Sequence, residues 1–280
     1  MSPAANSNLE FVSDHSATTD LARETLLAEA GYGCAICGAP IVTFVSSGSG
    51  EIVLCPEHSR FLEEGQADQS MAAHPFNLAH SAESGMLLVS SRYPVTRFKG
   101  VIVVNDELTI SADGEAVLRL RVLGGRLLVS MKLYDAEGVV RAEIVDNEWV
   151  NGDSQDVVIE HSSNKLMITF QTGAPILSID TSRTPLQLTA SLAFGGVPIS
   201  IGSKGISVGD RLASFMDDGY AGCVLDIDTE TQSVAVTPDP RHGGHSIIVT
   251  ERDPFQRIVK ALNAMASLRS HIEDDPFSHL

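Results

Sequence analysis

The chain has 280 residues, of which 43% are hydrophobic and 20% are charged, so one large or two modest globular domains are expected. Its 36 acidic residues outnumber 19 basic residues, and the net charge of −17 disfavours a nucleic-acid partner, because basic side chains supply most of the affinity for phosphates. No apolar run approaches the roughly 20 residues of a membrane span, and the N-terminus lacks a signal-peptide pattern, so we expect a cytoplasmic protein without a membrane partner.

The chain begins with a polar segment, residues 1–18, that is predicted to be a disordered arm. A short helix is predicted to follow, capped by Thr19 or Asp20. Gly31 and Gly33 are expected to end it, because glycine tolerates the left-handed conformation at a helix C-terminus.

Four residues with the spacing of metal ligands come next, namely Cys34, Cys37, Cys55 and His58. They form a Cys-x2-Cys pair and a Cys-x2-His pair separated by 17 residues, and Cys3His is a common ligand set of structural zinc sites. A β-hairpin is predicted between the pairs and a helix after the second. The sequence therefore predicts a Zn²⁺ site that stabilises a segment too small to bury its own core. The alternative is three buried thiols beside a surface histidine.

This region resembles the zinc-stabilised members of the HNH endonuclease family. The resemblance rests on AGYGCAICGAPIV (residues 30–42) and IVLCPEHS (52–59), with softer similarity in HPFNLAHSAESG (74–85) and in the β segment 127–150. It implies a treble-clef zinc knuckle with flanking helices over residues 19–80. It also implies a role in bacterial or phage DNA processing or defence, where such modules are common.

The residues that would make such a domain a nuclease are missing. In the family, a histidine in the hairpin activates water, and a histidine directly after the last zinc ligand helps to hold a second metal ion. Here residues 45–47 are Val-Ser-Ser and His58 is followed by Ser59, and a serine is neither a base near neutral pH nor a good ligand for a hard cation. We therefore predict a catalytically degenerate domain with no catalytic residues, acting as a binding or assembly module. An active metal-dependent endonuclease that uses His74 or His80 as its base is the alternative.

Residues 81–250 change to a β pattern, with short alternating segments and turn signals every few residues. The overall fold class is therefore predicted to be α+β, with a larger, mainly β domain that is a sandwich, a barrel or solenoid-like. Residues 251–280 are predicted to form an amphipathic helix and tail that docks on this domain or binds a partner. A protein partner or self-association is expected. A second alternative makes the β domain the ligand- or protein-binding part, capped by the zinc knuckle.

Four other residues could act chemically or form a contact surface. His242 and His245 could bind a metal, but the glycines between them favour a surface loop. Cys223 falls in a predicted strand and is expected to be a small core residue. Trp149 follows an acidic edge that is either a solvated strand end or a surface for a cation or a basic partner, and its ring is either a contact patch or a core residue.

Overall fold

The computed structural model describes residues 17–47, 50–66, 87–89, 94–98, 101–104, 107–134, 139–152, 157–170, 175–213, 219–221, 223–238 and 245–247. These contain two α-helices and twenty β-strands, so the chain is mostly β, as predicted. Neither helix has the length and apolar character that crossing a membrane requires. Nearly all of the predicted arm, and the helix predicted within residues 251–280, lie outside the described residues.

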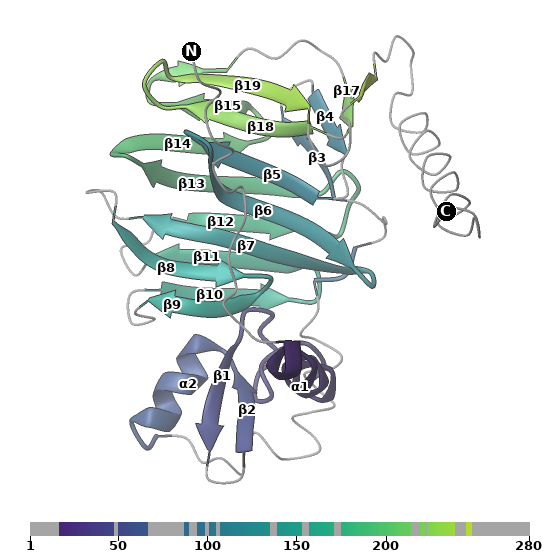
Figure 1. Ribbon diagram of the computed structural model, residues 1–280, viewed down its shortest axis with the longest axis vertical. Helices are drawn as coiled ribbons and strands as arrows, with labels where there is room; N and C mark the ends of the chain where they lie inside the picture. The colour runs from purple at the N-terminus through teal and green to yellow at the C-terminus, as the bar shows by residue number, and fades with distance from the viewer. Residues whose placement is uncertain are drawn as a thin grey trace, which may run out of the picture.

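The N-terminal part, residues 17–66, is a small unit that we call the metal module (Figure 1). An antiparallel hairpin lies between its two helices, and a turn that carries the first cysteine pair joins the first helix to the hairpin. The elements are α1 (Ala17–Glu29), β1 (Thr43–Ser47), β2 (Gly50–Leu54) and α2 (Pro56–Glu63). The predicted helix, hairpin and second helix are therefore confirmed.

The structure confirms the predicted end of α1 but not its predicted start. The helix begins at Ala17, so Thr19 and Asp20 lie inside it and the prediction that one of them caps it is wrong. The helix ends at Glu29, and Gly31 follows with a φ of 69°, as predicted for a glycine that terminates a helix. The N–H of Tyr32 then donates to the carbonyl of Leu27 at 2.6 Å, which closes the helix with the hydrogen bond typical of a glycine-terminated end.

The β part contains two seven-stranded sheets. In the first, the front sheet, the strand order is β19-β18-β5-β6-β7-β8-β9, and all neighbours are antiparallel except β18 and β5. Its strands are β5 (Glu107–Ala112), β6 (Glu115–Leu123), β7 (Arg126–Tyr134), β8 (Val140–Val145), β9 (Glu148–Gly152), β18 (Cys223–Asp228) and β19 (Ser233–Pro238).

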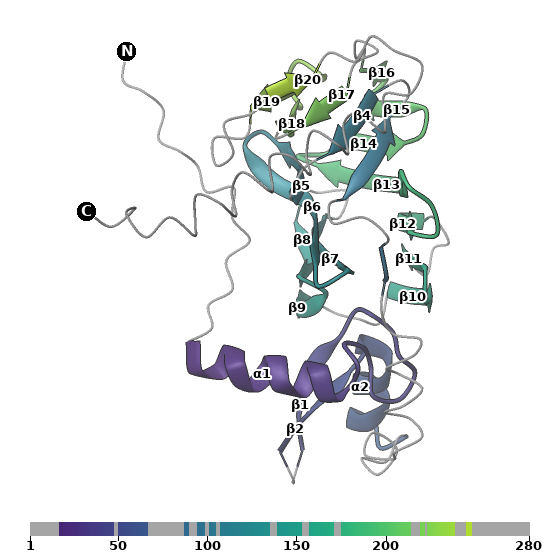
Figure 2. The same cartoon turned by 90° about the vertical axis from the view of Figure 1, so that its right-hand side faces the viewer.

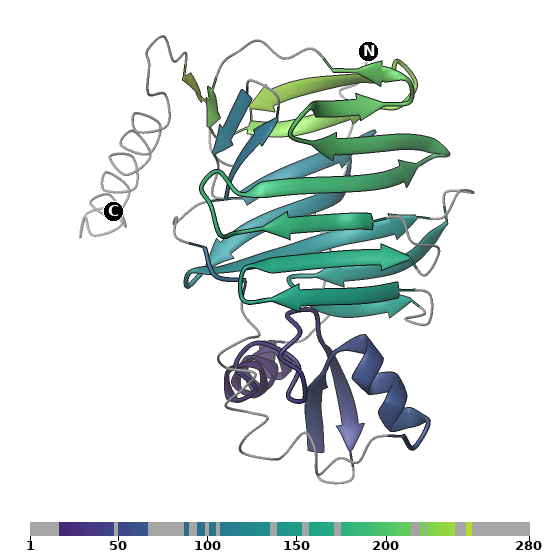
Figure 3. The same cartoon turned by 180° about the vertical axis from the view of Figure 1, so that it is seen from behind.

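The second, the back sheet, is an antiparallel meander in chain order, seen from its own side in Figure 3. Its strands are β10 (Val157–Ser162), β11 (Lys165–Phe170), β12 (Pro175–Asp180), β13 (Gln187–Phe194), β14 (Val197–Gly202), β15 (Gly205–Val208) and β16 (Arg211–Leu212). A four-stranded sheet in the order β20-β17-β4-β3 lies at the end away from the metal module (Figure 2). It consists of β3 (Val95–Phe98), β4 (Val101–Val104), β17 (Gly219–Ala221) and β20 (His245–Ile247).

The front and back sheets face each other and share one hydrophobic core, which the edge-on view of Figure 2 shows as two layers. Val129 and Met131 of β7 and Leu177 and Ile179 of β12 are all fully buried, and residues 187–192 of β13 alternate strictly between exposed and buried. A period of two is what a strand with one buried face requires. Of the three predicted β architectures, the sandwich is therefore the one observed. The segment 198–209, which has a solenoid-like rhythm, forms the antiparallel pair β14–β15 instead.

The metal module is attached to the end strand of the front sheet. Ile41 is fully buried and belongs to the core of the sandwich, whereas its neighbour Val42 belongs to the smaller core of the metal module. Val42 also forms a parallel bridge to β9, since its N–H donates to the carbonyl of Asn147 at 2.9 Å and its carbonyl accepts from the N–H of Trp149 at 2.6 Å. The two parts are thus joined by backbone hydrogen bonds and by a shared core residue. The predicted boundary near residue 80 lies outside the described residues.

Candidate metal centre

The first cysteine pair lies in the turn between α1 and β1. Within this turn the N–H of Gly38 donates to the carbonyl of Cys34 at 2.8 Å, and the N–H of Cys34 donates to the carbonyl of Ala39 at 2.9 Å. Gly38 has a φ of 77°, a conformation that a side chain with a Cβ disfavours. This tight turn carries Cys34 and Cys37 on the same loop.

The second pair lies at the start of α2. Cys55 is the N-cap residue, with extended backbone angles, and Pro56 occupies the first helical turn, where its missing N–H is not needed. The sulfur of Cys55 accepts a hydrogen bond from the backbone N–H of His58 at 3.5 Å. A thiolate in this position also lies at the positive end of the helix dipole, which favours its negative charge. The helix start therefore both orients Cys55 and His58 and stabilises the ionised sulfur.

The four predicted ligands converge. Three sulfurs and one imidazole nitrogen, those of Cys34, Cys37, Cys55 and His58, all lie within 4.8 Å of one another. Tetrahedral zinc, with Zn–S near 2.3 Å, requires S···S and S···N separations of about 3.8 and about 3.6 Å. The sulfurs of Cys37 and Cys55 are 3.8 Å apart, and the Nδ1 of His58 is 3.7 Å from the sulfur of Cys34 and 3.1 Å from that of Cys55. All three cysteines are free thiols, so these residues form one group that can hold a metal ion.

The surroundings of this group are mostly small and apolar. Its core consists of the side chains Ala30, Cys34, Ala35, Ala39, Val42, Val53, Leu54 and Cys55. Two of these eight are candidate ligands, and three others are alanines that bury little area each. Phe61 contacts the ring of His58 edge-on, with centroids 6.0 Å apart. A core of this size contributes little free energy, and a bound ion would supply the missing part.

The candidate ligands shift one another's pKa values because they lie so close together. Hydrogen bonds from Cys37 and Cys55 lower the pKa of the Cys34 thiol far below its usual range. The hydrogen bonds of Cys55 with Cys34 and Cys37 raise the pKa of Cys55, and burial adds to this. Hydrogen bonding to Cys34 raises the pKa of His58 to about 10. A bound divalent cation would favour the ionised form of the cysteine sulfurs.

The other residues singled out in the sequence do not join this group. Trp149 is buried in the core of the sandwich, and its ring N–H donates to the carbonyl of Gly152 at 3.2 Å, so it is a core residue rather than a contact patch. His245 begins β20 and does not lie in the predicted loop, whereas His242, His74 and His80 lie outside the described residues. Cys223 begins β18, as predicted. Within the described ranges, the four predicted ligands are the one group of Cys, His, Asp and Glu side chains placed to hold a metal ion.

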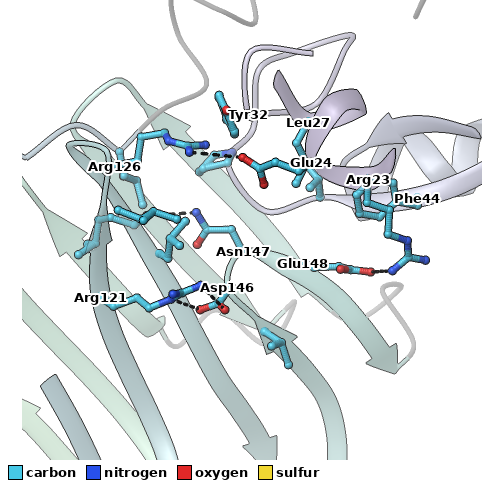
Figure 4. Close-up of a pocket in the computed structure, with 17 residues that line it drawn as sticks. Arg23, Glu24, Leu27, Tyr32, Phe44, Arg121, Arg126, Asp146, Asn147 and Glu148 are labelled. Atoms are coloured by element: carbon cyan, nitrogen blue, oxygen red, sulfur yellow. Dashed lines mark hydrogen bonds and ion pairs between the residues drawn. The ribbon is translucent and has the colours of Figure 1, made fainter. Parts of the chain in front are cut away.

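Two carboxylates of the acidic edge before Trp149 are partly buried and paired with arginines, so they do not form a free cation site. Asp146 accepts two hydrogen bonds from Arg121, at 2.9 and 2.7 Å, and Glu148 accepts one from Arg23 of α1 at 2.9 Å. The same residues line a cleft of about 310 Å³ between the metal module and the front sheet (Figure 4). Sequence analysis missed this cleft because its walls come from segments far apart in the chain. The one signal for it is the pair Arg121 and Arg126, which lie on either side of the turn between β6 and β7 and both line the cleft.

Replacing Asp146 with asparagine is expected to destabilise the fold by about 1–3 kcal/mol, because it leaves Arg119 and Arg121 without their shared carboxylate. The hydroxyl of Ser130 also donates to Asp146 at 3.3 Å and accepts from its backbone N–H at 2.9 Å. Urea unfolding of Asp146→Asn measures the change. Asp210→Asn, at an exposed position of the back sheet, is the control and should stay within about 0.5 kcal/mol of the parent. Equal stability of the two variants would contradict this.

Comparison of the chain with protein-family models, with curated proteins and with solved structures finds no match in any of the three.

Proposed function

We propose that Cys34, Cys37, Cys55 and His58 hold one structural Zn²⁺ and that the metal module is a catalytically degenerate, HNH-like treble clef. The proposal rests above all on the convergence of the four ligand atoms within 4.8 Å. Thiolate and imidazole are the ligands that zinc prefers, and hard cations such as Mg²⁺ select oxygen instead. The element order also supports it, since a cysteine turn, a hairpin and a helix that starts at the second ligand pair make up a treble clef.

A structural role is favoured over a catalytic one because four protein ligands fill a tetrahedral ion and leave no position for water. The hairpin supports the same conclusion. Strands β1 and β2 read TFVSS and GEIVL, so neither carries a histidine that could act as a base. Ser59, directly after the last ligand, lies inside α2, where its N–H donates to the carbonyl of Cys55 at 2.9 Å.

The protein is then a binding or assembly module that acts through protein partners or self-association in the cytoplasm. The HNH resemblance supports a role in bacterial or phage DNA processing or defence. The net charge of −17 supports a protein partner over direct contact with a phosphate backbone. The runner-up is an active nuclease whose base is His74 or His80.

Metal analysis coupled to a plasmid-nicking assay tests this proposal. We expect one zinc per chain by elemental analysis, and no nicking of supercoiled plasmid in the presence of added magnesium, manganese or nickel. The double variant His74→Ala/His80→Ala is the matched control for any background signal. Nicking that this variant abolishes would establish the nuclease, and a chain purified without zinc would remove the structural site.

A further inference from the structure

The cleft between the metal module and the front sheet is lined by apolar and by charged side chains (Figure 4). The apolar lining includes Leu27, Val42, Phe44, Leu87, Leu128 and Val145. The charged lining, which we call the rim, consists of three arginines, one from α1 and two from the front sheet, and three carboxylates. A concave, mostly apolar surface with a few converging charges is typical of a site for a small ligand.

Two of the three rim arginines are engaged by carboxylates at hydrogen-bonding distance. Arg121 makes the bidentate pair with Asp146, and Arg23 pairs with Glu148 at 2.9 Å while its guanidinium lies 4.5 Å from the centroid of the Phe44 ring. These pairs hold the walls of the cleft together. They leave no good geometry for a further anion at either position.

The third arginine, Arg126, packs on an aromatic ring. Its guanidinium lies over the ring of Tyr32, 3.1 Å from the centroid, and its side chain is only 14% exposed. Its Nη2 is 3.9 Å from the Oε1 of Glu24, which is beyond hydrogen-bond distance, and the Glu24 side chain is 54% exposed. The ring of Tyr32 therefore fixes the plane of the guanidinium in the lining of the cleft. The neighbouring carboxylate of Glu24 is exposed and lies outside hydrogen-bond distance.

We propose that this cleft binds a ligand with an apolar body and one carboxylate, and that the ligand's carboxylate takes the place of Glu24 beside Arg126. A guanidinium held in one plane offers two parallel N–H donors that match a carboxylate. The apolar body then lies on Leu27, Val42 and Leu128. A volume of about 310 Å³ is at the small end of ligand sites, so the ligand is a small free acid or the last residue of a peptide.

The charge balance of the cleft supports an anionic ligand. The chain as a whole carries −17, so most of its surface repels anions. At the rim three arginines balance three carboxylates, and an outward turn of the exposed Glu24 leaves one net positive charge beside Arg126. This is a place in an acidic protein where a carboxylate is attracted rather than repelled.

None of the four candidate metal ligands lines the cleft. Zinc content and ligand binding are therefore measured separately on the same preparation of the full chain. A zinc-loaded chain that binds neither probe overturns the cleft proposal and leaves the zinc proposal standing.

Isothermal titration calorimetry of the full chain with two probes tests the site. The probes are 4-phenylbutyrate, a small free acid, and an N-acetylated tripeptide with a C-terminal leucine and a free carboxylate. We expect at least one to bind with a dissociation constant below about 1 mM and its neutral amide to bind about tenfold more weakly. Binding of the free acid alone identifies a small molecule as the ligand class, and binding of the peptide alone identifies a chain terminus.

Two substitutions should change this affinity in opposite directions. Arg126→Gln is expected to weaken binding about tenfold, because the positive charge and the two parallel N–H donors of the guanidinium are lost. Glu24→Gln is expected to strengthen it about threefold, because a competing carboxylate at a partly screened position is removed. Arg97→Gln, at an exposed position of β3 in the small sheet, is the matched control and should leave affinity unchanged.

If Arg126→Gln fails to fold, Glu24→Gln still tests the proposal, because Glu24 lies on an exposed helix surface. The fluorescence of Trp149, the single tryptophan of the chain, gives a second readout because its N–H binds the carbonyl of Val42 at the edge of the cleft. Acids that bind no better than their amides would overturn the proposal. So would Glu24→Gln affinities equal to those of the parent, or no heat of binding up to about 10 mM ligand.

Discussion

Replacing Cys55 with serine is expected to abolish zinc binding and to unfold the metal module while leaving the sandwich folded. Serine is as good an N-cap as cysteine, so α2 keeps its helix-start residue and loses only the metal ligand. Structural zinc contributes an apparent binding free energy of about 10–16 kcal/mol, which exceeds what the alanine-rich core of the module supplies. The loss should therefore be local and large.

Elemental analysis and amide hydrogen exchange measure the two parts of this result. We expect the zinc content of Cys55→Ser to fall to background and exchange protection to disappear over residues 30–63, while strands of the back sheet stay protected. Cys223→Ser, which changes the one cysteine outside the predicted ligand set, is the matched control and should keep its zinc. A Cys55→Ser chain that retains zinc, or whose module stays protected, would contradict the structural-zinc proposal.

Replacing Ile41 with alanine is expected to lower the free energy of unfolding of the sandwich by about 2–5 kcal/mol. Ile41 belongs to the segment between the cysteine pairs, yet its side chain is fully buried in the core that the front and back sheets share. Truncating it leaves a cavity that the surrounding strands fill only in part. Because most small domains have a total stability of about 5–15 kcal/mol, this single change is a large fraction of it.

Urea unfolding followed by far-ultraviolet circular dichroism, with zinc present throughout, measures the effect. Ile41→Val should cost about 0.5–1.5 kcal/mol, in proportion to the smaller cavity. Leu21→Ala, at a position of α1 that is 74% exposed, should stay within about 0.5 kcal/mol of the parent. If Ile41→Ala were as stable as Leu21→Ala, the metal module and the sandwich would not share a core in solution.

The strands were predictable where one face of a sheet is buried. In β13 the exposed Gln187, Thr189 and Ser191 alternate with the buried Leu188, Ala190 and Leu192, which follows the period of the pleat. The pairing of the cysteines with His58 was predictable for a similar reason, because a two-residue gap fixes both side chains to one turn. The strands and the metal-ligand set were thus both predicted from local sequence patterns.

Other features depend on contacts between distant segments, and local patterns do not contain them. The choice of a sandwich over a barrel required knowing that β18 pairs in parallel with β5, more than a hundred residues earlier. The arginine partners of Asp146 and Glu148 come from β6 and α1, so an edge that looks solvated in the sequence is paired in the fold. The start of α1 was misplaced because capping residues also occur inside helices.

The bridge from Val42 to β9 bears on how the protein avoids aggregation. β9 is the last strand of its sheet, and such a border strand offers backbone donors and acceptors to any extended chain nearby. At Asn147 and Trp149 those groups are already taken by Val42, so an extended segment of another molecule cannot pair there. A bound ion that orders the cysteine turn therefore also keeps the edge strand β9 covered. Removal of the ion would expose β9 and favour aggregation of the chain.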